Sequence, residues 1–428
     1  MYKVSQYTQI RQFDTKIIIF NTYSGAIAKI DEKMKEVLTS SKLDLSLLSR
    51  KAVEVLEENK FIVPYQLDEY QKIIDQEKSS LFGDDGFLTF VIAPTLNCNF
   101  SCSYCFEPRN LRKSMSSETI SDVISYLKSQ LTSTTKRIKI TWFGGEPLLA
   151  IETIEKISQE LIAYCDQNNI KYFSRIITNG YFLTGSVSEK LHNQCRVQSA
   201  QVTLDGCEKT HEKAKGALPG AYKKIIKNIN EASNYMGISI RLNVVKTDYA
   251  GLKDIVDELM NHFKDHLNIR LYLAEVCDDW NLSNDDIVCK SPYWRQRRIF
   301  DDYVNKFYPH RLTNRVQLAG NNLKCGLIKK RNAVIGPDGE LYRCEHMLGR
   351  ADEIIGLCKE GLYHNQADRK FDSFEHPNKC MKCIIFPICM TECPNDIIEN
   401  KTNRIDCDAK IDTILHEFVR VISKDRYL

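Results

Sequence analysis

The chain has 428 residues, with 59 lysines and arginines against 56 aspartates and glutamates, for a formal net charge of +3. This balance argues against a nucleic-acid-binding protein that depends on a strongly basic surface. No run of about 18 apolar residues occurs and the first residues are polar, so we expect neither a membrane span nor a signal peptide. The 16 cysteines are therefore expected in the reducing cytoplasm, where clustered cysteines more often bind metal or carry out chemistry than form disulfides.

Residues 1–80 have the pattern of a separate small domain. The predicted elements are a hairpin of residues 7–13 and 16–20 around Asp14-Thr15, helices at 32–38 and 45–57, a short apolar segment at 61–64, and a polar helix at 67–77. A Gly-Asp-Asp-Gly stretch then precedes Phe87 and marks a domain boundary.

From Phe87 onward, apolar runs alternate with helical patterns. Strands are predicted at 87–93, 138–142, 175–178, 201–204, 238–245 and 269–274, and helices at 118–131, 153–167, 186–193, 221–235 and 252–263. This alternation predicts an α/β fold with a parallel sheet. In such sheets the functional groups gather at the carboxyl ends of the strands.

Three cysteines follow the first of these strands, at Cys98, Cys102 and Cys105. A structural zinc site normally has four protein ligands. Three thiolates on one loop better suit an iron–sulfur cluster that leaves one iron open. A zinc site with a fourth ligand elsewhere is the alternative that this spacing leaves.

Further motifs stand at the ends of the next strands. They are Gly144-Gly145-Glu146-Pro147, Thr178-Asn179-Gly180, and Thr203-Leu204-Asp205-Gly206, with Asn243 inside the fifth strand. The two glycines leave the backbone open to close approach by a ligand, and Glu146 can accept a hydrogen bond from an ammonium group. Asp205 has the alternative role of a turn or helix-capping residue.

The ordered motifs from Phe87 to Ala274 resemble those of the radical S-adenosylmethionine (SAM) enzymes. The resemblance implies a partial (β/α)6 barrel in which Cys98, Cys102 and Cys105 hold a [4Fe-4S] cluster that chelates SAM. The residues implied to contact SAM are Tyr104, Gly144, Gly145, Glu146, Pro147, Thr178, Thr203, Asp205 and Asn243. Lys215 stands near a position where the family often has arginine, but it lacks the bidentate fork and is left out of the predicted site.

Seven more cysteines have regular spacing near the end of the chain. Cys325 and Cys344 flank a predicted hairpin with a Pro-Asp-Gly turn, and Cys380, Cys383, Cys389, Cys393 and Cys407 follow. Zinc is again the alternative occupant, because Cys-x2-Cys pairs suit it well.

This region resembles a SPASM extension, which carries two auxiliary [4Fe-4S] clusters. The resemblance assigns Cys325, Cys344 and Cys393 to auxiliary cluster I, and Cys380, Cys383, Cys389 and Cys407 to auxiliary cluster II. Some members have an eighth cysteine shortly before Cys325, and residues 318–324 have none. Auxiliary cluster I is therefore expected to have an open or substrate-ligated iron, the alternative being a distant ligand such as Cys289 or Cys277.

Residues 1–80 are similar in pattern to the winged-helix-like elements that recognise the leader of a ribosomally made peptide. In that family the leader adds as a strand to a sheet edge. A structural cap or an oligomerisation segment is the alternative. The predicted domains are thus 1–80 for recognition, 86–300 for the radical SAM core and 301–428 for the auxiliary clusters.

These resemblances predict a radical SAM/SPASM peptide maturase, a cytoplasmic enzyme with three [4Fe-4S] clusters. It would cleave SAM reductively and use the 5′-deoxyadenosyl radical to abstract hydrogen from a precursor peptide, installing a thioether or carbon–carbon crosslink. The implied partners are the precursor peptide with its leader and a ferredoxin- or flavodoxin-type electron donor, with no nucleic acid and no membrane. The alternatives are a sulfatase-maturating enzyme that generates formylglycine, and a non-catalytic iron–sulfur electron carrier or sensor.

Overall fold

The computed structural model describes residues 1–13, 16–108, 110–243, 251–274, 292–313, 319–320, 325–372, 374–391, 393–399 and 407–424. The predicted turn at Asp14-Thr15, the end of the predicted fifth strand, and both Cys277 and Cys289 lie outside these residues. The chain forms two compact units. The first unit contains Met1–Gly83, Arg315–Cys325 and Ser373–Leu428, and the second contains Asp84–Asn314 and Gly326–Asp372.

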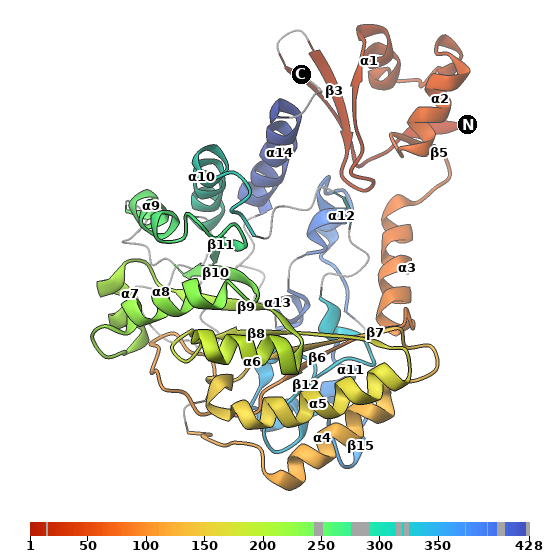
Figure 1. The fold of residues 1–428 in the computed structure, drawn as a ribbon. Helices are drawn as coiled ribbons and strands as arrows, with labels where there is room; N and C mark the ends of the chain where they lie inside the picture. Colours follow the sequence, from red (N-terminus) through yellow and green to blue (C-terminus); the bar gives the residue numbers. More distant parts are fainter. Residues whose placement is uncertain are drawn as a thin grey trace. The chain divides into compact units, whose positions relative to one another are not determined.

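The second unit is built on a ten-stranded sheet (Figure 1). Its six parallel strands neighbour one another in chain order: β6 (Phe87–Ile92), β7 (Arg137–Trp142), β8 (Lys171–Thr178), β9 (Val197–Leu204), β10 (Gly237–Asn243) and β11 (Ile269–Ala274). Next to β6 the sheet continues through β12 (Ala333–Ile335), β13 (Glu340–Tyr342), β14 (Gly356–Leu357) and β15 (Gly361–Leu362). β12 is parallel to β6, and the strands after it are antiparallel.

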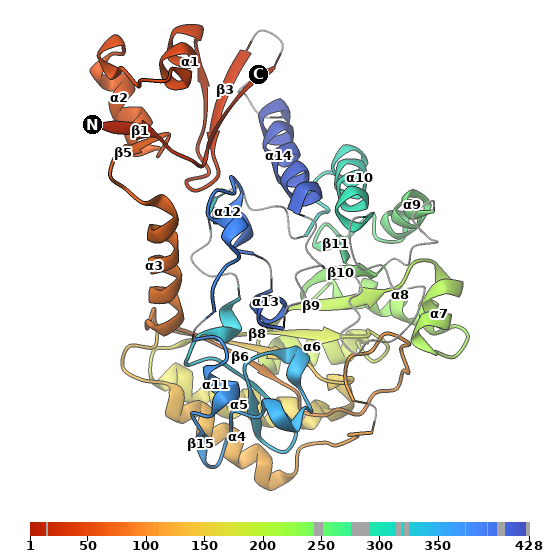
Figure 2. The ribbon, with the colours of Figure 1, turned by 180° about the vertical axis from the view of Figure 1, so that it is seen from behind.

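Helices connect the parallel strands and cover the apolar face of the sheet. They are α4 (Ser117–Gln130), α5 (Ile151–Gln167), α6 (Gly185–Cys195), α7 (Glu208–Lys215), α8 (Ala221–Ala232), α9 (Leu252–His262) and α10 (Pro292–Phe307). Figures 1 and 2 both show α4 and α5 side by side along the sheet. The starts of α4 and α6 are capped by the hydroxyls of Ser116 and Thr184, as expected for these residue types.

The two faces of the parallel strands differ in character because side chains alternate along a strand. Ile176 on β8 and Val202 on β9 have no exposed surface and face the helices. Their neighbours Arg175 on β8, Gln201 on β9 and Arg241 on β10 are half-buried and face the other way. The second face is therefore polar, which suits a sheet whose inner side holds a ligand rather than a core.

The first unit contains a three-stranded antiparallel sheet in the order β2 (Thr8–Phe13), β3 (Lys16–Asn21), β4 (Ile27–Ile30). Around it lie the β1 (Tyr2–Val4) and β5 (Ile62–Pro64) pair and the helices α1 (Glu32–Thr39), α2 (Arg50–Glu58), α3 (Glu69–Phe82), α12 (Phe386–Cys389), α13 (Pro394–Ile398) and α14 (Cys407–Lys424). Within this unit Phe20 of β3 stacks on Phe418 of α14, with ring centroids 4.5 Å apart. The first 83 residues thus share a core with the C-terminal segment.

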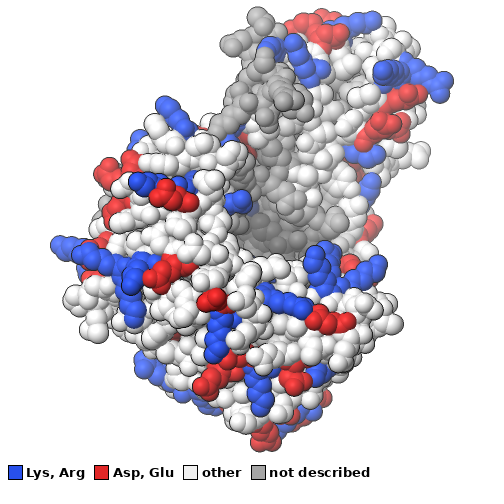
Figure 3. All heavy atoms as spheres, in the orientation of Figure 1, with Lys and Arg blue, Asp and Glu red and all other residues white. Residues whose placement is uncertain are grey.

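The predicted strands of the parallel sheet are all present, within a few residues of their predicted bounds. The winged-helix type of residues 1–80 and the domain boundaries at 80, 86 and 300 stay predictions. No helix in the described part of the chain is long and apolar enough to cross a membrane. On the face shown in Figure 3, acidic and basic side chains are interspersed, as expected for a net charge of +3.

Candidate active site

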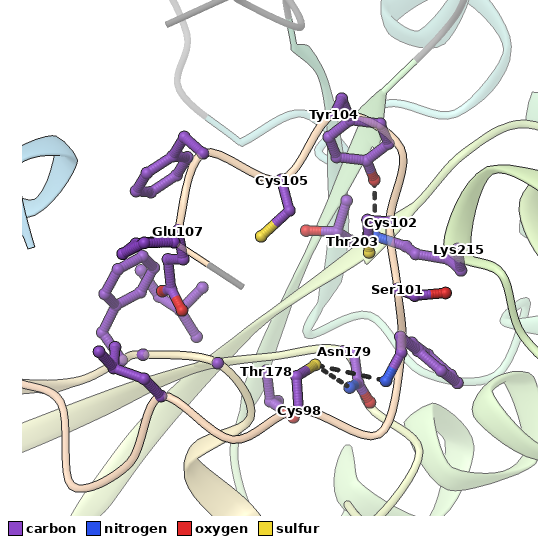
Figure 4. A pocket seen from close by; sticks show the side chains of 18 of the residues that line it. Cys98, Ser101, Cys102, Tyr104, Cys105, Glu107, Thr178, Asn179, Thr203 and Lys215 are labelled. Carbon is purple, nitrogen blue, oxygen red and sulfur yellow. Dashed lines mark hydrogen bonds between the residues drawn. The ribbon is translucent and has the colours of Figure 1, made fainter. Parts of the chain in front are cut away.

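The three clustered cysteines lie on the loop that leaves β6, at the carboxyl end of the sheet. The backbone N–H groups of Ser101 and Ser103 donate to the carbonyls of Lys215 and Ala214 at the end of α7, over 2.9 and 3.0 Å. These bonds hold the loop over the strand ends. Cys98, Cys102 and Cys105 all line one cavity of about 190 Å³ (Figure 4).

Donor groups are directed at the sulfur of Cys98. The backbone N–H of Phe100 lies 3.5 Å from this sulfur, and the side-chain nitrogen of Asn179 lies 4.0 Å from it. Hydrogen bonds of this kind are found around cluster-ligating sulfurs and tune the potential of the cluster. The three thiols form no disulfide, so three thiols on one loop, facing one cavity with donors nearby, fit an iron–sulfur cluster.

The glycines of the Gly144-Gly145 pair are required by the cysteine loop itself. Gly144 has a φ of 110°, and a Cβ there would lie 2.3 Å from the carbonyl oxygen of Thr95. A Cβ on Gly145 would lie 2.4 Å from the carbonyl oxygen of Asn97. Both glycines line the cavity, and the structure adds a reason for them beyond the predicted contact with a ligand: the two loops approach backbone to backbone.

Glu146 joins this loop to the end of β8. It is completely buried, and its carboxylate accepts hydrogen bonds from the Thr178 hydroxyl at 2.8 Å, the Asn179 N–H at 2.8 Å and the Leu148 N–H at 3.0 Å. Burial raises the pKa of Glu146 to about 7, although these hydrogen bonds act in the opposite direction. Glu146 and Pro147 do not appear among the lining residues, whereas Thr178 does. A direct contact of Glu146 with a ligand ammonium stays a prediction.

A buried polar cluster forms the opposite side of the cavity, around the hydroxyl of Tyr104 (Figure 4). This hydroxyl donates to Asp205 at 2.6 Å and accepts from Lys215 at 2.7 Å and Asn243 at 3.2 Å. Asp205 is 2% exposed and does not line the cavity. Asp205 therefore positions Tyr104 and Lys215. These two side chains, together with Thr203, line the cavity.

Residues 92–267, which contain all of these groups up to Asn243, match the model of the Radical SAM superfamily. The chain carries a radical SAM domain. The predicted family, the α/β fold class and the prediction of an enzyme are confirmed. A radical SAM domain implies a [4Fe-4S] cluster and S-adenosylmethionine as cofactors.

Two curated relatives align over most of this radical SAM chain. It is 24% identical over 429 residues to the radical SAM cyclopropyl synthase TigE of Paramaledivibacter caminithermalis, across 90% of this chain and 87% of that protein. It is 22% identical over 373 residues to the cysteine-type anaerobic sulfatase-maturating enzyme of Clostridium novyi, across 80% of this chain and 97% of that protein. The chain is thus similar both to a radical SAM cyclopropyl synthase and to a sulfatase-maturating enzyme.

Two solved structures share the fold. The structure of anSMEcpe with bound AdoMet superposes with a TM-score of 0.62 at 18% identity, covering 78% of this chain and 98% of that chain. SuiB of Streptococcus suis bound to the precursor peptide SuiA superposes with a TM-score of 0.53 at 19% identity, covering 93% of this chain and 97% of that chain. At these identities the likeness establishes the fold of the radical SAM chain.

Several residues of the radical SAM site were not predicted, among them Lys215, Asn179 and Glu107. Lys215 and Asn179 line the cavity, and Glu107 is 9% exposed and lines it with its carboxylate directed inward (Figure 4). Burial raises the pKa of Glu107 to about 8. The sequence contained part of the signal, since Asn179 belongs to the Thr-Asn-Gly motif and Glu107 follows Cys105 by two residues. Only the structure shows that these side chains line the cavity.

The C-terminal cysteines assigned to auxiliary cluster II all belong to the first unit. Burial raises the pKa of Cys380 and Cys383, and nearby Cys389 and Cys407 add to the rise. These four thiols therefore lie close to one another. In the described part of the chain no group of three or more His, Cys, Asp or Glu side chains is arranged to hold a single metal ion. An iron–sulfur cluster is larger than one ion and its ligands lie farther apart, so the four thiols are compatible with a cluster.

The cysteines assigned to auxiliary cluster I are divided between the units. Cys325 and Cys393 belong to the first unit and Cys344 to the second. Cys393 is exposed, and Cys325 is among the groups that lie near it. The assignment of these three ligands stays a prediction.

Proposed function

We propose that this radical SAM enzyme is a peptide maturase, which modifies a ribosomally synthesised precursor peptide bearing a leader and forms a carbon–carbon or thioether crosslink. When bound, a reduced cluster with SAM supplies an organic radical that abstracts hydrogen from the substrate. The two auxiliary clusters would accept the remaining electron or hold a substrate thiolate. A ferredoxin- or flavodoxin-type protein is the proposed electron donor.

The residues of the cavity have defined roles in this proposal. Cys98, Cys102 and Cys105 hold the first cluster. Gly144 and Gly145 offer backbone groups to the methionyl end of SAM, and Tyr104, Thr178 and Thr203 contact its remaining parts. The direct hydrogen bonds and the ion pair around Asp205 keep Tyr104 and Lys215 in place, which favours a single orientation of the cofactor.

The observation that carries peptide recognition is the small sheet of the first unit. In the part of the chain that the structure describes, β2 and β4 each pair with β3 alone. An extended peptide adds to such an edge through backbone hydrogen bonds. The backbone N–H of Asn21 in β3 donates to the carbonyl of Ala26. In an antiparallel ladder the N–H groups of successive residues point alternately toward and away from the partner strand. In this register the N–H of Lys29 in β4 therefore points away from β3. The same alternation directs the N–H of Gln12 in β2 outward.

The comparisons support this proposal over sulfatase maturation. SuiB, whose structure contains a precursor peptide, matches 93% of this chain, whereas anSMEcpe matches 78% while being covered almost completely itself. A larger part of this chain therefore lacks a counterpart in anSMEcpe than in SuiB. The name of TigE, a cyclopropyl synthase, favours carbon–carbon bond formation over a thioether. Sulfatase-type maturation remains the second candidate because of the higher TM-score of 0.62.

The test uses anaerobically reconstituted enzyme, SAM, a chemical reductant and a precursor peptide with or without its leader. A crosslink appears in mass spectrometry as a loss of two hydrogens without reactivity toward hydrazides. A hydrazide-reactive aldehyde would instead support formylglycine formation, and no modified peptide would contradict the proposal.

Proline at position 29 removes an outward N–H of the β4 edge, and alanine there retains it. Lys29→Pro should therefore weaken modification of the leader-bearing peptide, with Lys29→Ala as the matched control. Gln12→Pro and Gln12→Ala test the β2 edge in the same way. Equal turnover by both proline variants and both alanine variants would contradict recognition at the sheet edges.

A further inference from the structure

A second cavity, of about 260 Å³, lies on the inner face of the parallel strands of the second unit. It shares six lining residues with the cysteine cavity, so the two spaces adjoin: Tyr104, Phe106, Phe143, Ile177, Thr203 and Lys215. The residues that line the second cavity alone are Arg175, Gln201, Arg241, Asn243, Glu345 and His346. A group held here would lie next to the SAM pocket.

Arg175 occupies this cavity from the middle of β8. It pairs across the sheet with Thr141 of β7, and its Nε donates to the Thr141 hydroxyl at 3.0 Å. This single bond fixes the base of the guanidinium and leaves its two terminal nitrogens for another acceptor. Among the described residues, Arg175 forms no ion pair.

Other cations surround Arg175 on the same face. Arg241 lies two strands away, and its Nε donates to Asn243 at 3.0 Å. Burial and the charge of Arg175 lower the pKa of Lys139. The pKa of Tyr272 is raised by burial, and the nearby charges of Arg241 and Arg175 oppose that rise. Both effects indicate a positive potential on this inner face.

None of the described anionic groups forms an ion pair with Arg175. Lys215 is already paired with Asp205, with 3.2 Å between nitrogen and oxygen. Among the described lining residues of this cavity, Glu345 is the acidic one. A half-buried guanidinium without an anion loses hydration that no other interaction replaces. A carboxylate would replace it by accepting two parallel hydrogen bonds from the guanidinium N–H groups.

We propose that Arg175, with Arg241 nearby, binds a carboxylate of the substrate peptide beside the reaction site. The carboxylate belongs either to an aspartate or glutamate side chain or to the C-terminus of the peptide. This inference rests on the proposed function. The methionyl carboxylate of SAM is a poorer candidate, because Arg175 does not line the cysteine cavity and precedes the strand end at Thr178 by three residues.

The test measures binding of small amides to the cluster-reconstituted, SAM-loaded enzyme by calorimetry. N-acetylaspartate N-methylamide and N-acetylglutamate N-methylamide present the side-chain carboxylates, with the asparagine and glutamine analogues as their neutral controls. N-acetyl-alanyl-alanine, compared with its amide, presents the C-terminal carboxylate. We expect one acidic compound to bind about tenfold more tightly than its neutral analogue.

The variant Arg175→Gln should remove this preference, and Arg175→Lys should retain part of it because the charge remains. Arg270→Gln is the matched control, since Arg270 is an exposed arginine on β11 of the same sheet. Equal binding of acids and amides by the unsubstituted enzyme, or an unchanged preference in Arg175→Gln, would overturn the inference. A loss of SAM affinity in Arg175→Gln without a change in the preference would also overturn it.

These outcomes are independent of peptide modification. If the proposed function fails, no peptide is modified, yet the preference for a carboxylate can still be measured. If the inference alone fails, peptides are modified and the preference is absent.

Discussion

The ammonium group of Lys215 lies 3.2 Å from the carboxylate of Asp205, and the two side chains are 5% and 2% exposed. Burial by itself would lower the pKa of Lys215, but Asp205 and Tyr104 raise it well above its usual value. Lys215 therefore stays cationic in the cavity wall. The pair also fixes the hydroxyl of Tyr104, which both residues contact.

Replacing Lys215 by methionine should destabilise the second unit and weaken SAM binding together. The substitution leaves the buried Asp205 without its cation, and breaking a buried pair in this way costs about 3–5 kcal/mol. Thermal unfolding and equilibrium binding of SAM measure the two effects. Lys213→Met is the control, because Lys213 is an exposed residue of the same helix. An unfolding temperature equal to that of Lys213→Met would contradict the role of the pair.

Gly145→Ala should weaken SAM binding by more than about tenfold, because even a small displacement of binding groups is costly. The added Cβ would lie 2.4 Å from the carbonyl oxygen of Asn97, so the glycine loop and the cysteine loop must separate. Gly237→Ala is the matched control, since its Cβ would come no nearer than 3.9 Å to Gln198. Calorimetry measures the binding of SAM to both variants. Equal affinity of the two variants would show that position 145 tolerates a side chain and does not require glycine.

Most of the parallel sheet could be predicted from the sequence, because each strand is a short apolar run between helices with a clear period. The cysteine positions and the motifs at the strand ends could be predicted as well, because their order along the chain reflects the order of the strands. The pairing of β12 with β6 could not be predicted. It joins residues more than 240 positions apart, and no local pattern records such a contact.

The polar inner face of the sheet could not be predicted either. Arg175 and Arg241 lie inside strands that the sequence predicts by their apolar neighbours, and a lone arginine there does not indicate to which side it points. Lys215 was left out of the predicted site because lysine lacks the bidentate guanidinium of arginine. In the structure it forms an ion pair with Asp205, for which a single positive charge is enough. Side-chain partners, rather than residue types, decide these roles.

His211 predicts a dependence of stability on pH. Burial lowers its pKa to about 4, and its Nδ1 accepts a hydrogen bond from the N–H of Asp205 at 3.2 Å, which requires the neutral ring. The unfolded state takes up a proton near pH 6.5 and the folded state does not, so stability is lost as pH falls below about 6.5. Between pH 7.5 and 5.5 the loss from this group is about 1 kcal/mol.

The variant His211→Gln should show a smaller loss of stability over this range than the unsubstituted enzyme. Chemical unfolding at the two pH values measures the difference. His192→Gln is the control, because His192 is exposed on α6. If both variants lose stability equally, the buried ring of His211 is not the source of the pH dependence.

A chain of hydrogen bonds in the first unit leads from α3 to Cys380, a proposed ligand of auxiliary cluster II. Glu77 of α3 lies 2.7 Å from Nε2 of His376, whose Nδ1 contacts the hydroxyl of Thr391. This hydroxyl donates to the sulfur of Cys380 at 3.5 Å. Thr391 has a φ of 62°, which is rare for a β-branched residue, and its two hydrogen bonds are a reason for this strained backbone.

Thr391→Val should make the reduction potential of auxiliary cluster II more negative by about 40 mV, the equivalent of one hydrogen bond of about 1 kcal/mol. A donor to a cluster sulfur favours the reduced state, whose charge is more negative, and valine removes that donor without changing the shape of the side chain. A redox titration followed by electron paramagnetic resonance measures the potential. Thr413→Val is the control, because Thr413 is also buried in this unit but its hydroxyl bonds to the Ala409 carbonyl of its own helix. An equal potential in both variants would show that Thr391 does not act on the cluster. A shift of the potential confined to Thr391→Val, with the iron content unchanged, would support both this contact and Cys380 as a ligand.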